Sequence, residues 1–286
     1  MSGEEILKRI ANLTLDEERA LYALRDGLVE DCTFDGPADG ESALKEARNI
    51  TVRNCAFCLR YPFWHVEGFS VENCSLTEGV RAPLWYAKGG RFDRCSVMGV
   101  KALRECEAVA FSRCTVESEE FGWRCRDISL EDSSFVSQYF LFETKCGSMK
   151  NCTLKGKYSF QYTEDLSVEN CDLDTKDAFW HSKNVTVKNS VVKGEYLGWY
   201  SEGLTLINCK IIGTQPLCYC KNLTLIDCTM EETDLSFEYS SVNATVLGEI
   251  ESVKNPACGK IVADRIGQII LEDSVMATDC EIITKS

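Results

Sequence analysis

The sequence predicts an all-β fold, a right-handed parallel β-helix in which one chain winds through about 12 turns of about 19 residues each. Three observations support this prediction. A Cys or Ser marker recurs at a nearly constant spacing, apolar and polar residues alternate around it, and the five tryptophans fall into a single column of the repeat. A fixed period close to twenty residues is typical of a solenoid.

The marker residue follows the first predicted strand of each repeat. Apolar residues stand five and three positions before it, as Leu166 and Val168 do, and this alternation is typical of a strand. Asn or Asp directly precedes most markers, and these side chains tolerate the left-handed backbone of a bend. The markers are Cys32, Cys55, Cys74, Cys95, Cys114, Ser133, Cys152, Cys171, Ser190, Cys209 and Cys228.

A second short strand follows the bend, and a polar turn then leads to a third strand. The tryptophans stand nine residues after a marker once a two-residue insertion is allowed for, at Trp64, Trp85, Trp123, Trp180 and Trp199. Small or apolar residues stand two positions further on, so we expect the tryptophans to point inward. The leucine-rich repeat shares the period, but its return segment carries leucines, whereas here that segment is aromatic and alternates with period two.

The repeat predicts one β-helix domain over residues 1–286, with an N-terminal cap at 1–13, regular turns at 14–240 and irregular turns at 241–286. In the cap, Ser2 and Glu5 have the spacing of a capping box. Apolar residues at Ile6, Ile10 and Leu13 share one helical face, so we expect a short amphipathic helix there.

The amino-acid composition limits which binding partners and which cellular compartment we expect for the protein. A net charge of −14 disfavours nucleic acid and anionic membranes, which bind clustered cations. Met1–Ile10 has no long apolar run typical of a signal peptide, and no apolar stretch predicts a spanning helix, so we expect a cytoplasmic protein. The 17 cysteines are an odd number in a long chain, and we interpret them as reduced core residues.

Four segments resemble the recurring motifs of a microbial family that is catalogued as a domain of unknown function and grouped with the pectin-lyase-like β-helices. They are Glu18-Arg19-Ala20-Leu21, Gly40-Glu41-Ser42-Ala43-Leu44-Lys45-Glu46, Tyr61-Pro62-Phe63-Trp64 and Lys254-Asn255-Pro256. The resemblance covers essentially the whole chain. It implies the β-helix fold and, by wider analogy, a link to carbohydrate, and it brings no assigned catalytic residues.

If the tryptophans point inward, the residues on either side of them point outward. Aromatic residues and histidines are frequent at these positions, and an exposed apolar strip of this kind marks an interaction site. It suits an oligosaccharide, whose faces stack on rings, or a protein partner. The alternative is a face covered by loops, by the N-terminal segment or by a second subunit of a homo-oligomer. The predicted binding residues are His65, Tyr86, Tyr162, Phe179, His181, Tyr200 and Tyr219.

Charged residues on the same strip suggest catalysis as a second possibility. Glu105, Arg124 and Glu143 occupy successive turns, so the two carboxylates are expected about 9.5 Å apart, twice the strand spacing. That separation is at the wide end for the acid and base of an inverting glycosidase. The alternative is a ladder of alternating charges that stabilises the sheet.

A further charged cluster, Glu41, Arg60 and Arg81, stands where the turn enters the third strand, and it either binds an acidic sugar or pairs internally. No cofactor is expected. No metal site is expected either, because the two histidines lie six turns apart and the Cys218-x-Cys220 pair has no further ligands beside it. Two functions remain: a module that binds carbohydrate or a partner, and a carbohydrate-active enzyme of the hydrolase or lyase type.

Overall fold

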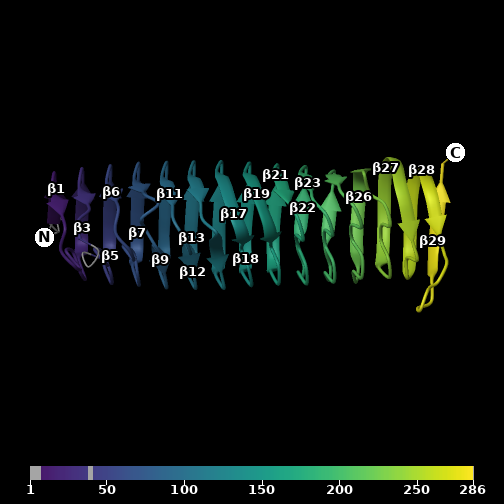
Figure 1. The fold of residues 1–286 in the computed structure, drawn as a ribbon, viewed down its shortest axis with the longest axis horizontal. Coiled ribbons are helices and arrows are strands. Elements are labelled where there is room, and N and C mark those ends of the chain that lie inside the picture. Colours follow the sequence, from purple (N-terminus) through teal and green to yellow (C-terminus); the bar gives the residue numbers. More distant parts are fainter. Residues whose placement is uncertain (1–7, 38–40, 286) are drawn as a thin grey trace, which may run out of the picture. The chain divides into compact units, whose positions relative to one another are not determined.

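The computed structural model describes residues 8–37 and 41–285, and the regular elements among them are all β-strands. The strands follow the chain through about 14 turns, and each pairs in parallel with the strand of a neighbouring turn (Figure 1). The predicted parallel β-solenoid is therefore confirmed, with slightly more turns than expected. The described residues contain no helix long and apolar enough to span a membrane.

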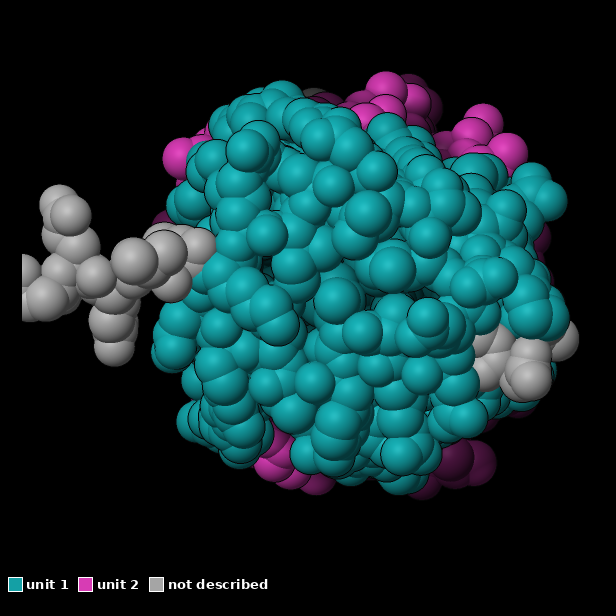
Figure 2. All heavy atoms as spheres, turned by 90° about the vertical axis from the view of Figure 1, so that its left-hand side faces the viewer, with its two compact units in different colours: residues 1–136 teal, residues 137–286 magenta. Residues whose placement is uncertain are grey.

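The chain divides into two compact units, residues 1–136 and 137–286, coloured teal and magenta in Figure 2. The boundary falls within strand β17 (Ser134–Phe140). In the first unit, side chains fill the space that the turns enclose. Its core is rich in buried phenylalanines that stack turn upon turn, such as Phe34 on Phe57, with ring centroids 4.6 Å apart.

Three stacks of strands build the first unit. The longest strand of each turn belongs to the first stack: β1 (Lys8–Ala11), β3 (Arg25–Glu30), β5 (Arg48–Arg53), β7 (Glu67–Glu72), β10 (Lys88–Asp93), β13 (Glu107–Ser112) and β16 (Arg126–Glu131). Short strands after the bend form the second: β2 (Thr14–Leu15), β4 (Thr33–Phe34), β6 (Ala56–Phe57), β8 (Ser75–Leu76), β11 (Ser96–Met98) and β14 (Thr115–Glu117). The third contains β9 (Leu84–Trp85), β12 (Leu103–Arg104) and β15 (Glu120–Trp123).

In the second unit the named strands continue the first two stacks, and the chain ends in longer strands. Its first stack comprises β18 (Lys145–Lys150), β20 (Glu164–Glu169), β22 (Thr186–Lys188), β24 (Thr205–Ile207) and β26 (Leu223–Glu231). After the bend follow β19 (Thr153–Ser159), β21 (Asp172–Thr175), β23 (Val191–Lys193) and β25 (Lys210–Ile212). The long parallel strands β27 (Ser241–Lys254), β28 (Cys258–Ile270) and β29 (Asp279–Thr284) complete the chain.

A hydrogen bond explains why the marker is Cys or Ser. The N–H of Cys55 donates to Sγ of Cys74 in the next turn at 3.3 Å, and Cys74 Sγ in turn donates to the carbonyl of Glu72 at 3.2 Å. Serine does the same, since the N–H of Cys114 donates to Oγ of Ser133 at 2.9 Å. These markers are buried, so the position requires a small side chain that both donates and accepts.

The residue before each marker turns the chain. Its φ lies between 49° and 58° in every described turn, in the left-handed region that Asn and Asp tolerate better than most residues. Amide side chains also bond up this column, as Asn54 Nδ2 does to Asp31 Oδ1 at 3.1 Å. The predicted bend is confirmed.

The third segment departs from the predicted strand alternation. Left-handed residues recur within it, as at Asp177, Phe179 and His181, with φ of 54°, 62° and 55°. Each one reverses the side to which the next side chain would point on an extended strand, so two neighbours can face the same side. The position before the tryptophans is consequently buried, which corrects the predicted outward orientation of Leu44, Phe63, Leu84, Leu103, Leu141, Phe160, Phe179 and Leu217.

The tryptophans are half-buried rather than central in the core. Trp180 Nε1 donates to the carbonyl of Tyr196 at 2.6 Å, and the Trp180 ring stacks on that of Trp199 with centroids 5.5 Å apart. Gln161 stands in the same column and donates through Nε2 to the carbonyl of Asp177 at 3.0 Å. The column therefore supplies an N–H donor for a carbonyl at the corner of the next turn.

The helix expected at residues 2–13 is wrong where the structure describes it. Residues 2–7 lie outside the described residues, whereas β1 is a strand whose Ile10 pairs with Val29 of β3. A parallel strand edge offers a full row of hydrogen-bonding groups, and a helix of about twelve residues is marginal on its own. Asn12, with φ of 58°, occupies the bend position of one more repeat.

We predict that Cys74→Ser changes the free energy of unfolding little, whereas Cys74→Ala lowers it by about 1–3 kcal/mol. Serine keeps an acceptor for the N–H of Cys55, and alanine leaves that buried donor unpaired. Urea unfolding measures both, with Cys258→Ala, at an exposed thiol, as the control. Equal losses for serine and alanine would show that the marker acts through packing alone.

We also predict that Phe179→Ala destabilises the protein by about 3–5 kcal/mol and by more than Trp180→Ala. Phe179 is 1% exposed and stacks on Phe160, whereas part of the Trp180 ring already contacts solvent. Chemical unfolding of the two variants side by side gives the difference. A larger loss for Trp180→Ala would place the core on the other side of this segment.

Candidate functional site

Four side chains of the second unit form a stacked column on its surface: Tyr162, His181, Tyr200 and Tyr219, from four consecutive turns. Successive ring centroids are 4.8, 5.0 and 4.8 Å apart, with interplanar angles of 11°, 8° and 13°. Backbone hydrogen bonds between turns fix the spacing, such as the 3.0 Å bond from the N–H of His181 to the carbonyl of Trp199. We call these four residues the ring column.

The ring column presents edges rather than faces to solvent. Tyr162 and Tyr200 are 48% and 47% exposed, yet the rings lie nearly parallel to one another, so each face contacts a neighbouring ring. The sequence-based expectation that sugar faces stack on these rings therefore needs correction. Ring edges, phenol hydroxyls and imidazole nitrogens are what the column offers.

Other residues predicted for the strip have different positions. In the first unit His65 stacks on Tyr86 with centroids 4.9 Å apart, so this pair forms a shorter column of the same kind. Phe179 does not lie on the surface, because its ring is buried in the core, where it stacks on Phe160 at 4.8 Å.

The predicted catalytic trio is divided between the two units. Glu105 and Arg124 are exposed residues of consecutive turns in the first unit, and the N–H of Glu105 donates to the carbonyl of Trp123 at 2.8 Å. Glu143 belongs to the second unit. Within residues 8–37 and 41–285 no group of three or more His, Cys, Asp or Glu is arranged to hold a metal ion.

In the cluster at the start of the third segment, two of the three residues pair with each other. Arg60 Nε lies 2.9 Å from Glu41 Oε2. Arg81 is exposed, and its backbone forms a bridge with Val100. The structure therefore favours internal pairing for Glu41 and Arg60.

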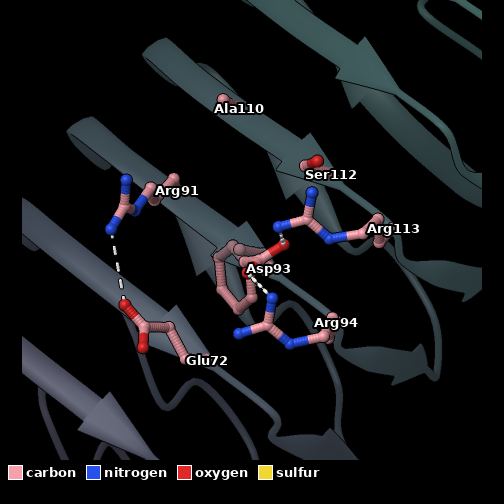
Figure 3. Close-up of a pocket in the computed structure, with 8 residues that line it drawn as sticks. Glu72, Arg91, Asp93, Arg94, Ala110, Ser112 and Arg113 are labelled. Atoms are coloured by element: carbon pink, nitrogen blue, oxygen red, sulfur yellow. Dashed lines mark hydrogen bonds and ion pairs between the residues drawn. The ribbon is translucent and has the colours of Figure 1, made fainter.

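Sequence reasoning missed a group of arginines on the first unit. Arg91, Arg94 and Arg113 surround a depression of about 390 Å³ on strands β7, β10 and β13, together with Glu72 and Asp93 (Figure 3). Ala110 and Ser112 belong to β13, the strand next to the one that carries Arg91. We call Arg91, Arg94 and Arg113 the arginine cluster.

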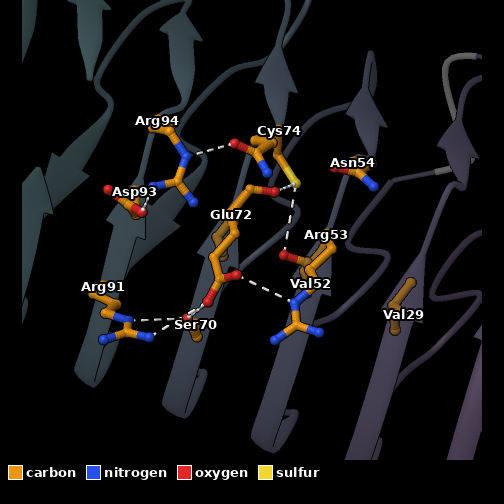
Figure 4. Close-up of polar contacts among 12 residues, drawn as sticks. Val29, Val52, Arg53, Asn54, Ser70, Glu72, Cys74, Arg91, Asp93 and Arg94 are labelled. Atoms are coloured by element: carbon orange, nitrogen blue, oxygen red, sulfur yellow. Dashed lines mark hydrogen bonds and ion pairs between the residues drawn. The ribbon is translucent and has the colours of Figure 1, made fainter. Parts of the chain in front are cut away.

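Each carboxylate of the depression pairs with two arginines. Glu72 lies between Arg53, at 3.2 Å, and Arg91, at 3.4 Å, while Asp93 pairs with Arg94, at 2.6 Å, and with Arg113 (Figure 4 shows the first three of these arginines).

Hydrogen bonds to these carboxylates shift two pKa values. The hydroxyl of Ser70 donates to Glu72 at 2.9 Å, and together with the arginines it holds the pKa of Glu72 below its usual range. The bond to Asp93 raises the pKa of Arg113. Glu72 is therefore ionised at neutral pH.

A signal for the arginine cluster is present in the sequence. Arg94 and Arg113 directly precede the markers Cys95 and Cys114, where the other repeats carry Asn or Asp. Both are left-handed, with φ of 52° and 54°. Arg94 Nε also continues the amide ladder by donating to Asn73 Oδ1 at 2.8 Å.

Comparison with solved structures finds weak likenesses. A surface adhesin of Streptococcus pneumoniae, PfbA, has a TM-score of 0.47 at 7% identity, over 81% of this chain and 82% of that chain. Tailspike protein 3 of bacteriophage CBA120 has a TM-score of 0.39 at 11% identity, over 96% of this chain and 51% of that chain. The A-module of the Azotobacter vinelandii mannuronan C-5 epimerase AlgE4 has a TM-score of 0.34 at 7% identity, over 90% of both chains.

No curated protein sequence matches the chain. A family model does match, over residues 8–283, and its description is "Protein of unknown function (DUF3737)". The predicted resemblance to a family of unknown function is confirmed, and the chain belongs to this family.

Proposed function

We propose that the protein is a binding module that holds an uncharged oligosaccharide along the ring column of its second unit. The observation that carries the proposal is the regular, exposed stack of Tyr162, His181, Tyr200 and Tyr219. Carbohydrate sites combine apolar ring surface with a few polar groups that fix orientation. The column supplies both, repeated at the spacing of the turns.

Recognition through ring edges differs from stacking on ring faces. Each tyrosine hydroxyl both donates and accepts a hydrogen bond, which is the pairing that sugar hydroxyls require. Burial and the nearby Glu238 carboxylate raise the pKa of Tyr219, so its phenol stays protonated and able to donate at neutral pH. An extended chain of hydroxyl-rich units lying along the column would meet one such group per turn, about 4.8 Å apart.

The net charge of −14 favours a neutral ligand over an acidic polymer on this surface. Catalysis lacks a comparable supporting observation. Glu105 is exposed on the first unit and Glu143 belongs to the second, so the two predicted catalytic carboxylates do not lie within one unit.

A cytoplasmic location is part of the proposal. The cysteines of the described residues are free thiols, and the marker thiols donate to backbone carbonyls, as Cys55 Sγ does to Arg53 at 3.1 Å. Thiols with such a role are kept in a reducing compartment.

We predict that Tyr200→Phe/Tyr219→Phe weakens binding of a neutral oligosaccharide by about 5- to 150-fold, because two hydrogen bonds of about 0.5–1.5 kcal/mol each are lost while the stack remains. A panel of neutral glycans identifies the ligand for the parent protein, and calorimetry gives the affinities. Trp199 contacts both tyrosines, with centroids 6.3 and 5.3 Å away, so its fluorescence reports on occupancy.

Tyr158→Phe is the matched control, since Tyr158 belongs to the same unit and stacks on Tyr139 away from the column. It is expected to bind like the parent. A parent protein that binds no glycan of the panel contradicts the proposal. So does self-association of the parent that the double substitution abolishes, because the column would then be an interface between copies.

A further inference from the structure

We infer that the arginine cluster of the first unit binds a small organic oxyanion, a carboxylate or phosphate carried on a body the size of a sugar. This site is separate from the ring column and does not depend on the function proposed for it. The depression of about 390 Å³ is within the range of small-molecule sites and far exceeds the space of a single water.

Charge is the first argument. Counting Arg53, four guanidinium groups face two carboxylates, in a protein with a net charge of −14. Most other ion pairs of the described residues join one cation to one acid, as Lys145 does with Glu164 at 2.8 Å and Lys176 with Glu195 at 2.6 Å. Glu120 is an exception, because it contacts both Lys101 and Arg104. The depression therefore holds positive charge that its own carboxylates do not neutralise.

Unused donors are the second argument. Arg91 donates Nε to Ser70 at 3.0 Å and contacts Glu72 through Nη2, whereas Arg94 uses Nε for Asn73 and Nη1 for Asp93. A guanidinium has five N–H donors, so several on each side chain point to solvent. Side-chain exposures of 65%, 48% and 53% for Arg91, Arg94 and Arg113 make them accessible to a ligand.

Shape is the third argument. Ala110 pairs in register with Arg91 of the preceding turn, so a methyl group stands where that turn carries a long side chain. The short side chains of Ala110 and Ser112 leave room between Arg91 and Arg113, and the depression is open there (Figure 3).

Backbone conformation is the fourth argument. Arg94 and Arg113 adopt the left-handed conformation at a position where the other repeats use Asn or Asp. Asn and Asp adopt this conformation more readily than other non-glycine residues do. Two arginines in successive turns at this position indicate a role for the guanidinium groups that Asn does not fill.

Calorimetric titration of the full chain with glucuronate and with glucose 6-phosphate tests the site, with glucose as the neutral probe. We expect one or both anions to bind, glucose to show no binding at this site, and affinity to fall as NaCl is raised. Binding of glucuronate alone assigns a carboxylate, and binding of the phosphate alone assigns a phosphate. Failure of both anions to bind overturns the inference.

The substitution Arg94→Asn/Arg113→Asn removes two guanidinium groups and restores the side chain that suits this backbone. We expect anion affinity to fall at least tenfold while the midpoint of thermal unfolding does not decrease. Arg91→Gln, at a residue of strand β10 with an ordinary backbone, is expected to weaken binding without affecting the bends.

The charge-matched control is Arg48→Gln/Arg126→Gln, because these arginines of the same unit pair with Glu67 and Asp127 away from the depression. It is expected to retain anion binding. An equal loss in this control, or unchanged affinity in both cluster variants, would show that net charge rather than a site governs binding. The glycan experiment on the ring column is unaffected by either outcome.

Discussion

The fold depends on a hydrogen bond that recurs at the bend of its turns. A left-handed residue takes the next N–H out of the strand ladder, and in a buried position that donor must find another acceptor. The marker of the following turn supplies it, as Cys74 does for Cys55 and Ser133 for Cys114. Each turn thus supplies the hydrogen-bond acceptor that the preceding turn needs. This explains why every marker is either Cys or Ser.

The same geometry decides what reaches the surface. Left-handed residues place side chains at fixed positions, outward at His181 and inward at Phe179, and the parallel register brings equivalent positions of successive turns into line. Surface side chains at equivalent positions therefore form columns whose members are separated by the spacing of the turns. The ring column and the arginine cluster are two such columns, at different corners of the turn and in different units.

The repeat, its bends and its parallel strands were predictable because marker and Asn columns are directly visible in the sequence. The first repeat was not, since Leu13 replaces the marker cysteine there. Phe179 was assigned to the wrong face because the period-two alternation assumes an extended backbone. The left-handed conformation of Phe179 was not predictable, because phenylalanine is not a residue type that favours it. Arg94 and Arg113 stand out in the sequence because the other residues that precede a marker are Asn or Asp. This exception points to a binding site only when the structure shows that both arginines line the depression.

The ring column and the arginine cluster differ in the contacts that stabilise their left-handed residues. A left-handed conformation costs an ordinary residue about 1–2 kcal/mol relative to the right-handed one. In the ring column, aromatic contacts of about 0.5–1.5 kcal/mol per pair offset much of that cost, so His181 and its neighbours are stable without a ligand. Exposed ion pairs contribute only about 0–1 kcal/mol, which leaves Arg94 and Arg113 less well compensated. Contacts within the protein therefore explain the choice of arginine at these two positions less well than they explain the residues of the ring column. A bound anion would explain the two arginines directly.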